Sequence, residues 1–329
     1  MRLTLKKWLT VNSLLSALLF AAMAFAVLHG SENITLSDAA GSDEKARTIL
    51  LLARLPRTIL AALVGMALAS SGGTFQALLR NPLADPFILG VSGGAALGSV
   101  LGIGFSLSFE LVSVAAFAGA VIAMLSIYAI SGARGRRDAT ALLLTGVIFN
   151  AFCFALILFV NAVVTMEQAY QILFLLIGNL EVTDIGTVAV VAAFVLTGFL
   201  VLCLLSGRMN LLSQGDDEAK SLGVDIGRLR AAIFFSASLM VGAAVAASGL
   251  IGFVGLFIPH AVRLMFGSDH RLLIPASGLL GAAFLVFADA AARTLLMHTG
   301  YATQLPVGVI TALVGAPLFM LLLRRQGQN

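Results

Sequence analysis

Long apolar runs separated by short polar segments cover almost the whole chain. A helix rises 1.5 Å per residue, so about 18 to 20 uncharged residues suffice to cross the hydrocarbon core of a bilayer. The pattern predicts an all-α fold of about ten membrane-spanning helices in one domain over residues 1–329. The predicted spans lie near residues 8–28, 57–79, 87–106, 111–131, 139–163, 186–206, 229–250, 252–266, 272–292 and 305–323.

The eighth predicted span differs from the others because it carries Pro259, His260 and Arg263. Proline removes a backbone donor, and charged or ionisable side chains are rare in contact with lipid. We therefore expect this segment to be short, broken or tilted.

Composition supports a membrane class. Hydrophobic residues make up 60% of the chain and charged residues 11%, against about 45–50% and 25% in soluble domains. The net charge of +4 comes from basic residues in short loops rather than a stripe, so nucleic-acid binding is not indicated. Cys153 and Cys203 lie inside apolar runs and are interpreted as buried thiols, with neither a disulfide nor a thiolate metal site.

The distribution of basic residues predicts the orientation. With the N-terminus in the cytoplasm and ten alternating spans, fifteen basic residues face the cytoplasm and five face outward, as the positive-inside rule requires. Both termini are then cytoplasmic, in an inner (plasma) membrane protein. The outward five are Lys45, Arg47, Arg54, Arg57 and Arg293.

The first apolar run has a second interpretation. It ends in Ala24-Phe25-Ala26, which is similar to a signal-peptide cleavage site. We expect the run to be retained as the first span, because it is long for a signal sequence and its removal would leave nine spans.

A faint internal repeat is present. Residues 64–72 and 241–249 share the pattern VGxAxAxSG. Either the second and seventh spans are equivalent members of two inverted halves, or two helices rich in small residues match by chance.

No sequence motif supports catalysis, a cofactor or a metal site. The four lysines lack the GxxxxGK[ST] context that binds phosphates, and the four histidines are dispersed. Any ATP must therefore be hydrolysed by another chain. An ion-driven secondary transporter is the alternative function, and it would need ionisable groups inside the membrane. Asp289 is the one carboxylate deep in a predicted span, and Arg293 follows at the spacing of an i,i+4 pair.

Two blocks resemble a known family. The first runs from Arg54-Leu55-Pro56-Arg57 to the segment 81–86, and the second joins residues 249–260 to residues 305–309. Both resemble the FecCD family of ABC permeases, which import cobalamin, haem and ferric siderophores. The resemblance implies a type II ABC importer permease fold and a homodimer in the lipid bilayer, with the fifth and tenth spans along the pathway. It also implies two ATPase subunits on the cytoplasmic side and one extracytoplasmic substrate-binding protein, and it leaves the cargo open.

The resemblance assigns roles to two groups of residues. Arg54, Arg57 and Arg293 would meet acidic residues of the binding protein by charge complementarity. The cytoplasmic loop of about residues 214–230 would receive the ATPase through an apolar side. Its candidate coupling residues are Asp217, Glu218, Ala219, Leu222, Gly223 and Val224.

Two further features have a structural interpretation. A corner between two helices is expected at residues 81–86, because prolines fix the backbone and remove donors. Glycines recur every fourth residue in the third span, which places them on one helix face for close packing. The corner residues are Asn81, Pro82, Asp85 and Pro86, and the glycines are Gly90, Gly94, Gly98 and Gly102.

Overall fold

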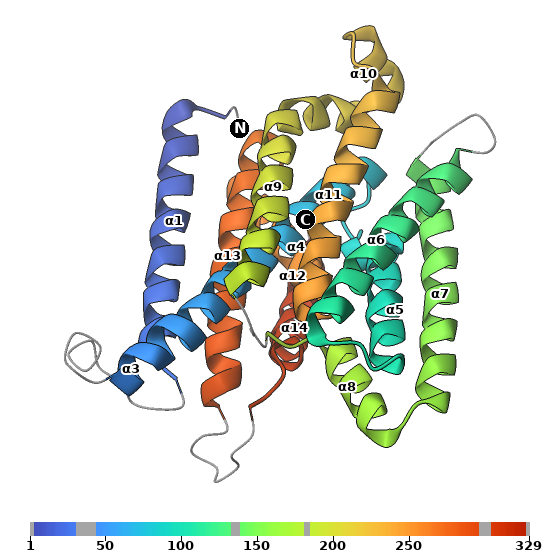
Figure 1. Ribbon diagram of the computed structural model, residues 1–329. Helices are drawn as coiled ribbons and strands as arrows, with labels where there is room; N and C mark the ends of the chain where they lie inside the picture. The colour runs from blue at the N-terminus through green and yellow to red at the C-terminus, as the bar shows by residue number, and fades with distance from the viewer. Residues whose placement is uncertain (1–2, 31–43, 133–138, 181–184, 296–303, 327–329) are drawn as a thin grey trace.

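A computed structural model describes residues 3–30, 44–132, 139–180, 185–295 and 304–326. Over these residues the chain is a bundle of helices without strands, which confirms the predicted fold class (Figure 1). The helix α10 projects from one end of the bundle, and α3 and α8 lie toward the opposite end. We call these the α10 end and the α3 end. The helices are α1 (Leu5–Leu28), α3 (Glu44–Thr48), the π-helical η1 (Ile49–Arg54), α4 (Leu55–Leu79), the 3-10 turn η2 (Pro86–Leu89), α5 (Val91–Gly104), α6 (Phe109–Ser131), α7 (Ala139–Val163), α8 (Met166–Ile177), α9 (Ile185–Gln214), α10 (Asp216–Ser221), α11 (Ile226–Ser248), α12 (Val254–Phe266), α13 (His270–Thr294) and α14 (Val307–Gln326).

In the described part of the chain, seven helices are long and apolar enough to cross a membrane: α1, the continuous Glu44–Leu79 helix, α6, α7, α9, α11 and α13. The third, eighth and tenth predicted spans are the shorter apolar helices α5, α12 and α14. The eighth is short, as expected, with 13 residues. The sequence missed α8, because its 12 residues are too few for a span.

Many large apolar side chains face outward, and many of the buried residues are small. On α7, Leu144, Phe152 and Phe159 are more than half exposed, whereas Ala61 and Ala69 of α4 are fully buried. Soluble proteins rarely expose apolar patches of this extent. In a membrane the same arrangement is favourable, because lipid covers the large side chains and small residues let helix backbones approach.

The glycine face of α5 packs against neighbouring helices. A Cβ added at Gly94 would lie 2.6 Å from the carbonyl oxygen of Gly119 on α6, and one at Gly98 would clash with the carbonyl of Ala115. Gly90 meets Gly146 of α7 in the same way. These positions therefore serve helix packing, as the four-residue spacing predicts.

We expect Gly72→Ala to destabilise the bundle, because a Cβ at Gly72 would clash with the backbone of Gly255 on α12. Overpacking of this kind costs about 1–3 kcal/mol. The control is Gly252→Ala, since a Cβ at Gly252 has open space within 4 Å. Thermal unfolding in detergent should show a lower midpoint for the first variant only, and equal midpoints would contradict the packing account.

Three helix ends meet inside the bundle and explain the short helices. The Leu250 N–H donates to the Leu175 carbonyl (3.1 Å), the Asn179 N–H to Ser248 (2.9 Å), and the Gly308 N–H to Gly178 (3.2 Å). Non-helical backbone at membrane depth is tolerated only where its polar groups are satisfied by protein or water. The ends of α8 and α11 and the start of α14 satisfy one another, so none of the three has to reach a membrane surface at this point.

The two halves of the VGxAxAxSG repeat adopt different backbones at the last position. Gly72 lies inside α4, which continues to Leu79. Gly249 caps the end of α11 with φ of 66°, and a Cβ there would clash with the carbonyl of Leu175. The equivalence of the two segments stays a prediction.

Candidate functional sites at the two ends of the bundle

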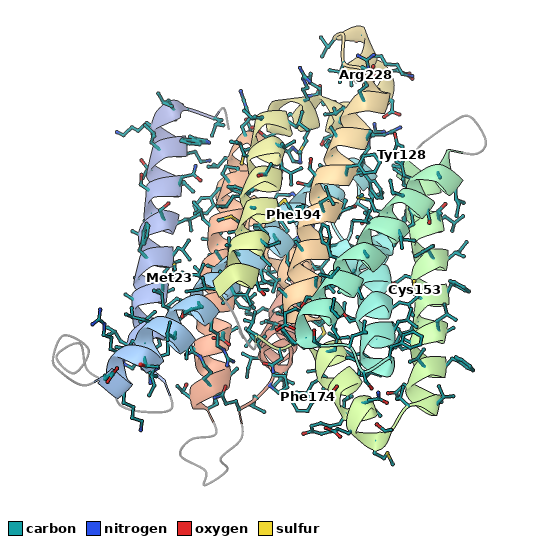
Figure 2. The ribbon with its side chains drawn as sticks, in the orientation of Figure 1. Met23, Tyr128, Cys153, Phe174, Phe194 and Arg228 are labelled. Atoms are coloured by element: carbon teal, nitrogen blue, oxygen red, sulfur yellow. The ribbon has the colours of Figure 1, made fainter. Side chains whose placement is uncertain are left out.

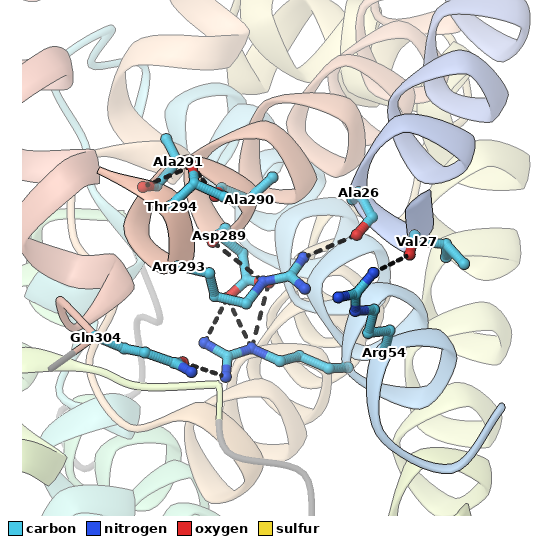
Figure 3. Close-up of polar contacts among 10 residues, drawn as sticks. Ala26, Val27, Arg54, Asp289, Ala290, Ala291, Arg293, Thr294 and Gln304 are labelled. Carbon is cyan, nitrogen blue, oxygen red and sulfur yellow. Dashed lines mark hydrogen bonds and ion pairs between the residues drawn. The ribbon is translucent and has the colours of Figure 1, made fainter. Parts of the chain in front are cut away.

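A buried ion cluster joins the start of α4 to the last turns of α13 (Figure 3), and Figure 1 shows that these helix ends lie toward the α3 end. Asp289 of α13 is 1% exposed. One of its oxygens accepts from Arg57 Nε at 3.0 Å, and the other lies 3.0 Å from Arg293 Nε. The i,i+4 pair of Asp289 with Arg293 is thus present, and Arg57 joins it from α4.

The same cluster holds the end of α1. Arg54 Nη1 donates to the carbonyls of Val27 and Leu28, each at 3.2 Å. Arg293 Nη2 donates to the Ala26 carbonyl at 3.3 Å. The last carbonyls of a helix lack partners within it and carry partial negative charge, so guanidinium groups stabilise them.

The opposite end of α1 is also fastened. Lys7 Nζ donates to the Phe266 carbonyl at 2.7 Å, and Trp8 Nε1 donates to the Arg271 carbonyl at 3.0 Å. The first apolar run is therefore a helix bound at both ends to neighbouring segments, with α13 packed along it.

The arginines singled out for docking lie deeper than the sequence indicated. The predicted second span begins near residue 57, but the helix starts at Glu44, so both Arg54 and Arg57 lie within the helix. Residue exposure is 5% for Arg54 and 6% for Arg293, and the Arg57 side chain is 13% exposed. Arg57 Nη1 donates to Gln304 Oε1 at 3.0 Å. Arg57 thus keeps the largest accessible part, and a docking role for the three stays a prediction.

At the α10 end, Asp216 fastens the predicted coupling loop to the bundle. It forms ion pairs with Arg80, the cap residue of α4, and with Arg230 of α11 at 2.8 Å. Arg80 Nε also donates to the Leu212 carbonyl at 3.0 Å. No local pattern in the sequence indicates this role of Asp216, because Arg80 is remote in the chain and Arg230 lies on the next helix.

The residues expected to form one apolar side of this loop differ in exposure. Ala219 is fully buried, whereas Leu222 is 61% exposed. Val224 is half-buried, and Asp217 and Glu218 are exposed. Gly223 follows α10 with φ of 79°, a conformation that favours glycine. Leu222 therefore projects an apolar side chain from the α10 end, where Figure 2 also places Arg228.

The corner at residues 81–86 is built by side-chain caps. Asn81 Oδ1 accepts from the Leu83 N–H at 2.9 Å, and Asp85 Oδ1 accepts from the Phe87 N–H at 2.8 Å. Pro82 is exposed and Pro86 is buried. Asparagine and aspartate commonly form such turns, because their side chains bond the backbone two residues on.

We expect Asp85 to make stability depend on pH. Burial raises the pKa of its carboxyl to about 6, partly opposed by the hydrogen bond from the Phe87 N–H. A raised pKa in the folded state means that stability falls as pH rises from about 4 to about 6, with a loss of the order of 1–3 kcal/mol. Asp85→Asn keeps the acceptor but does not titrate. The thermal midpoint of Asp85→Asn, relative to that of the wild type, should rise between pH 4.5 and pH 8. A difference in midpoint that stays constant over this pH range would contradict the pKa assignment.

The cluster around Asp289 has no free carboxylate oxygen, because both oxygens are paired with guanidinium groups. Over the described residues, no group of three or more metal-binding side chains occurs. Asp289 therefore offers no free carboxylate oxygen to an ion-driven transporter, the alternative function.

Comparison with known proteins identifies the family of this chain and supports its fold. The sequence matches the FecCD transport family over residues 14–325. The chain belongs to this family. It is 44% identical over 285 residues to the cobalamin import permease BtuC of Halobacterium salinarum, covering 86% of this chain and 75% of BtuC. It is 39% identical over 286 residues to the hemin transport permease HmuU of Yersinia pestis, covering 85% of this chain and 84% of HmuU.

A further relative and a solved structure are also ABC transporters. An uncharacterised ABC transporter permease of Bacillus subtilis, YvrB, is 42% identical over 293 residues, covering 87% of this chain and 82% of YvrB. A solved ABC transporter assigned to the metal-chelate type, in an inward-facing conformation, has a TM-score of 0.87 and 31% identity, covering 96% of this chain and 99% of that chain. The predicted family and permease fold are confirmed.

Proposed function

We propose that this chain is the membrane-spanning subunit of an ABC importer that moves an iron–siderophore, haem or cobalamin-type chelate. The observation that carries the proposal is the FecCD match along residues 14–325, together with a fold that follows a metal-chelate ABC transporter over 96% of the chain. Alternating access would be driven by ATP bound to other subunits, whose differential contacts bias one conformation over the other.

The purified chain alone should not hydrolyse ATP, because no lysine lies in a phosphate-binding loop. Phosphate release should stay at background in a preparation that mass spectrometry shows to be free of other subunits. Adding the ATPase subunits should raise it, with a catalytically dead ATPase as the control. Robust hydrolysis by the chain alone would overturn the assignment of a non-catalytic permease.

We propose a homodimer formed through α7 and α14, the helices that correspond to the fifth and tenth predicted spans. Both present exposed apolar side chains, among them Phe152 and Phe159 on α7 and Leu313 and Met320 on α14. The translocation pathway would then lie on the two-fold axis between the copies. Two ATPase subunits and one binding protein would complete the importer.

We propose that the α10 end faces the cytoplasm and that both termini lie there, in the inner (plasma) membrane. In the orientation predicted from the sequence, fifteen basic residues lie on the side of the α10 end and five on the side of the α3 end. Arg80 and Arg230 are among the fifteen, and both pair with Asp216 at the start of α10. The positive-inside rule favours this orientation. The α3 end would then receive the binding protein, and the loop containing α10 would receive the ATPase.

The docking role of the arginine cluster should appear as salt-dependent affinity. If Arg57 meets a carboxylate of the binding protein, Arg57→Glu exchanges attraction for repulsion in both copies of the dimer. A rim ion pair contributes about 0.2–1 kcal/mol, so two charge reversals should weaken binding several-fold. Surface plasmon resonance in nanodiscs should show a gap from wild type that shrinks at high salt.

Docking and folding must be separated in this experiment, because Arg57 also pairs with Asp289. Arg47→Glu is the control, since Arg47 is exposed on α3 and carries the same charge. Only variants with a wild-type elution profile are compared. Unchanged affinity for Arg54→Glu, Arg57→Glu and Arg293→Glu would assign the three arginines to fold stability alone.

A further inference from the structure

The second half of α14 is held to the rest of the described chain by few buried residues. Of residues 312–322, Gly315 and Phe319 are buried, and the others are exposed or half-buried. Both buried residues lie against α12. A Cβ at Gly315 would lie 2.6 Å from the Cβ of Phe253. The Phe319 ring meets the His260 ring edge to face, with 5.5 Å between the ring centroids. A segment with so small a buried face changes its position at the loss of few contacts.

The first of these two contacts carries backbone strain. Phe253, the N-cap residue of α12, has φ of 70°, in the left-handed region. This region is unfavourable for a bulky residue, and residues held in it gather at functional sites and switch regions. The Phe253 side chain keeps this conformation while it lies against Gly315.

The second contact leaves a buried polar group unpaired. His260 is 1% exposed, and neither of its ring nitrogens makes a hydrogen bond within the described part of the chain. One turn further along α12, Arg263 Nη2 donates to Gln76 Oε1 at 2.9 Å, while Arg263 Nη1 is also unpaired there. Buried polar side chains nearly always have a partner, so an imidazole with none against Phe319 is an exception that requires an explanation.

Both contacts raise the free energy of the arrangement in which α14 lies on α12. Backbone strain persists only where the surrounding packing requires it, and a buried imidazole has given up its hydrogen bonds to water. If α14 moves away from α12, water reaches the His260 ring, and Phe253 loses the neighbour that fixes its conformation. The proposed pathway supplies this water, because α14 borders the two-fold axis of the proposed dimer.

We propose that the α12–α14 contact is a switch in the transport cycle. His260 is dry and unpaired while α14 lies on α12, and it is hydrated in a second conformation in which α14 has moved away. ATP binding to the partner subunits need favour one arrangement by only a small free energy, because the contact between the two helices already contains unfavourable features. The inference rests on the proposed function and identifies the helix contact that changes.

Labelling of histidines with diethylpyrocarbonate tests the change in water exposure without any substitution. The permease with its ATPase subunits in nanodiscs is labelled during ATP turnover and, separately, without nucleotide, and mass spectrometry gives the modified fraction of each histidine. We expect the modified fraction of His260 to differ about five-fold or more between the two conditions. His270 is the internal control and should not change, because it is buried at the start of α13, where its ring is hydrogen-bonded to Asn210 at 2.7 Å.

Two substitutions test whether the hydrogen-bonding capacity of His260 is the property required. His260→Phe removes both unpaired nitrogens, so it should raise the thermal midpoint and lower ATP hydrolysis by the assembled complex about ten-fold or more. His260→Gln keeps a donor and an acceptor, and its rate of hydrolysis should stay within about three-fold of wild type. Ser238→Ala is the matched control, because the Ser238 hydroxyl is also buried and unpaired in the described structure but lies on α11. Its removal should leave hydrolysis unchanged.

The contrary outcomes are distinct. Equal modification of His260 in the two conditions, in a complex that hydrolyses ATP, would overturn the switch. Unchanged hydrolysis with His260→Phe, or a lowered midpoint for that variant, would do so as well. Equal losses with His260→Phe and His260→Gln would show that hydrogen bonding is not the required property and would also reject the switch. All of these outcomes leave the proposed function standing, whereas a wild-type chain that does not assemble with the ATPase subunits rejects the proposed function and the switch with it.

Discussion

Replacing Asp289 by alanine should destabilise the fold more than any other single substitution considered for this chain. The carboxylate is 1% exposed and lies between Arg57 and Arg293. Its removal leaves two guanidinium groups buried without their counter-charge, and breaking a buried pair from one side costs about 3–5 kcal/mol. Unfolding in detergent, followed by fluorescence-detected gel filtration, should show a large drop in the thermal midpoint. Asp289→Asn should lower the thermal midpoint somewhat less than Asp289→Ala, because an amide oxygen still accepts hydrogen bonds.

The control for this loss is the removal of an aspartate from an exposed ion pair. Asp217 pairs with Lys220 at 3.7 Å, and its side chain is 96% exposed. Asp217→Ala should change stability by less than about 1 kcal/mol, since surface pairs contribute little. If Asp289→Ala is as stable as Asp217→Ala, the cluster does not hold α1, α4 and α13 together.

Leu222→Asp should release the ATPase subunits while leaving the permease folded. Leu222 is 61% exposed, so the free protein has no need of its side chain for packing. If the side chain enters a groove of the ATPase, the substitution removes about 1.5–3 kcal/mol of apolar burial and places an unpaired carboxylate there. Together these reduce affinity about 100-fold or more. A pull-down in detergent should recover the dimeric permease without its ATPase.

Ser213→Asp is the control for the effect of the added negative charge alone. Ser213 is exposed on α9, just before the loop of residues 214–230, and gains the same charge without losing an apolar side chain. Stoichiometric recovery of the ATPase with Leu222→Asp would show that this loop is not the docking element. Loss with both variants would indicate a general effect of negative charge.

Helix identity was predictable wherever a long apolar run was uninterrupted, as in α7 and α9. The helical segment of residues 44–54 was missed, because Lys45, Arg47 and Arg54 give it the composition of a loop. Tertiary packing decides this case, since Arg54 is buried against the carbonyls at the end of α1.

The polar clusters were only partly accessible from the sequence. The pair of Asp289 and Arg293 follows from i,i+4 spacing. Arg57 lies 232 residues away from Asp289, and no local pattern links them. The six residues of α10 are too few for a helical period to decide which side is buried. The sequence therefore predicted one apolar side for Ala219, Leu222 and Val224, whereas Ala219 is buried and Leu222 is exposed.

Reconstitution tests most directly whether this FecCD chain is an importer permease. Proteoliposomes would contain the chain and its ATPase subunits, with the binding protein and a radiolabelled iron chelate on the side of the α3 end. We expect accumulation that requires ATP on the side of the α10 end, stops with Leu222→Asp, and is insensitive to collapse of ion gradients. Accumulation that persists without the ATPase and follows an imposed proton or sodium gradient would contradict the account and favour an ion-driven transporter.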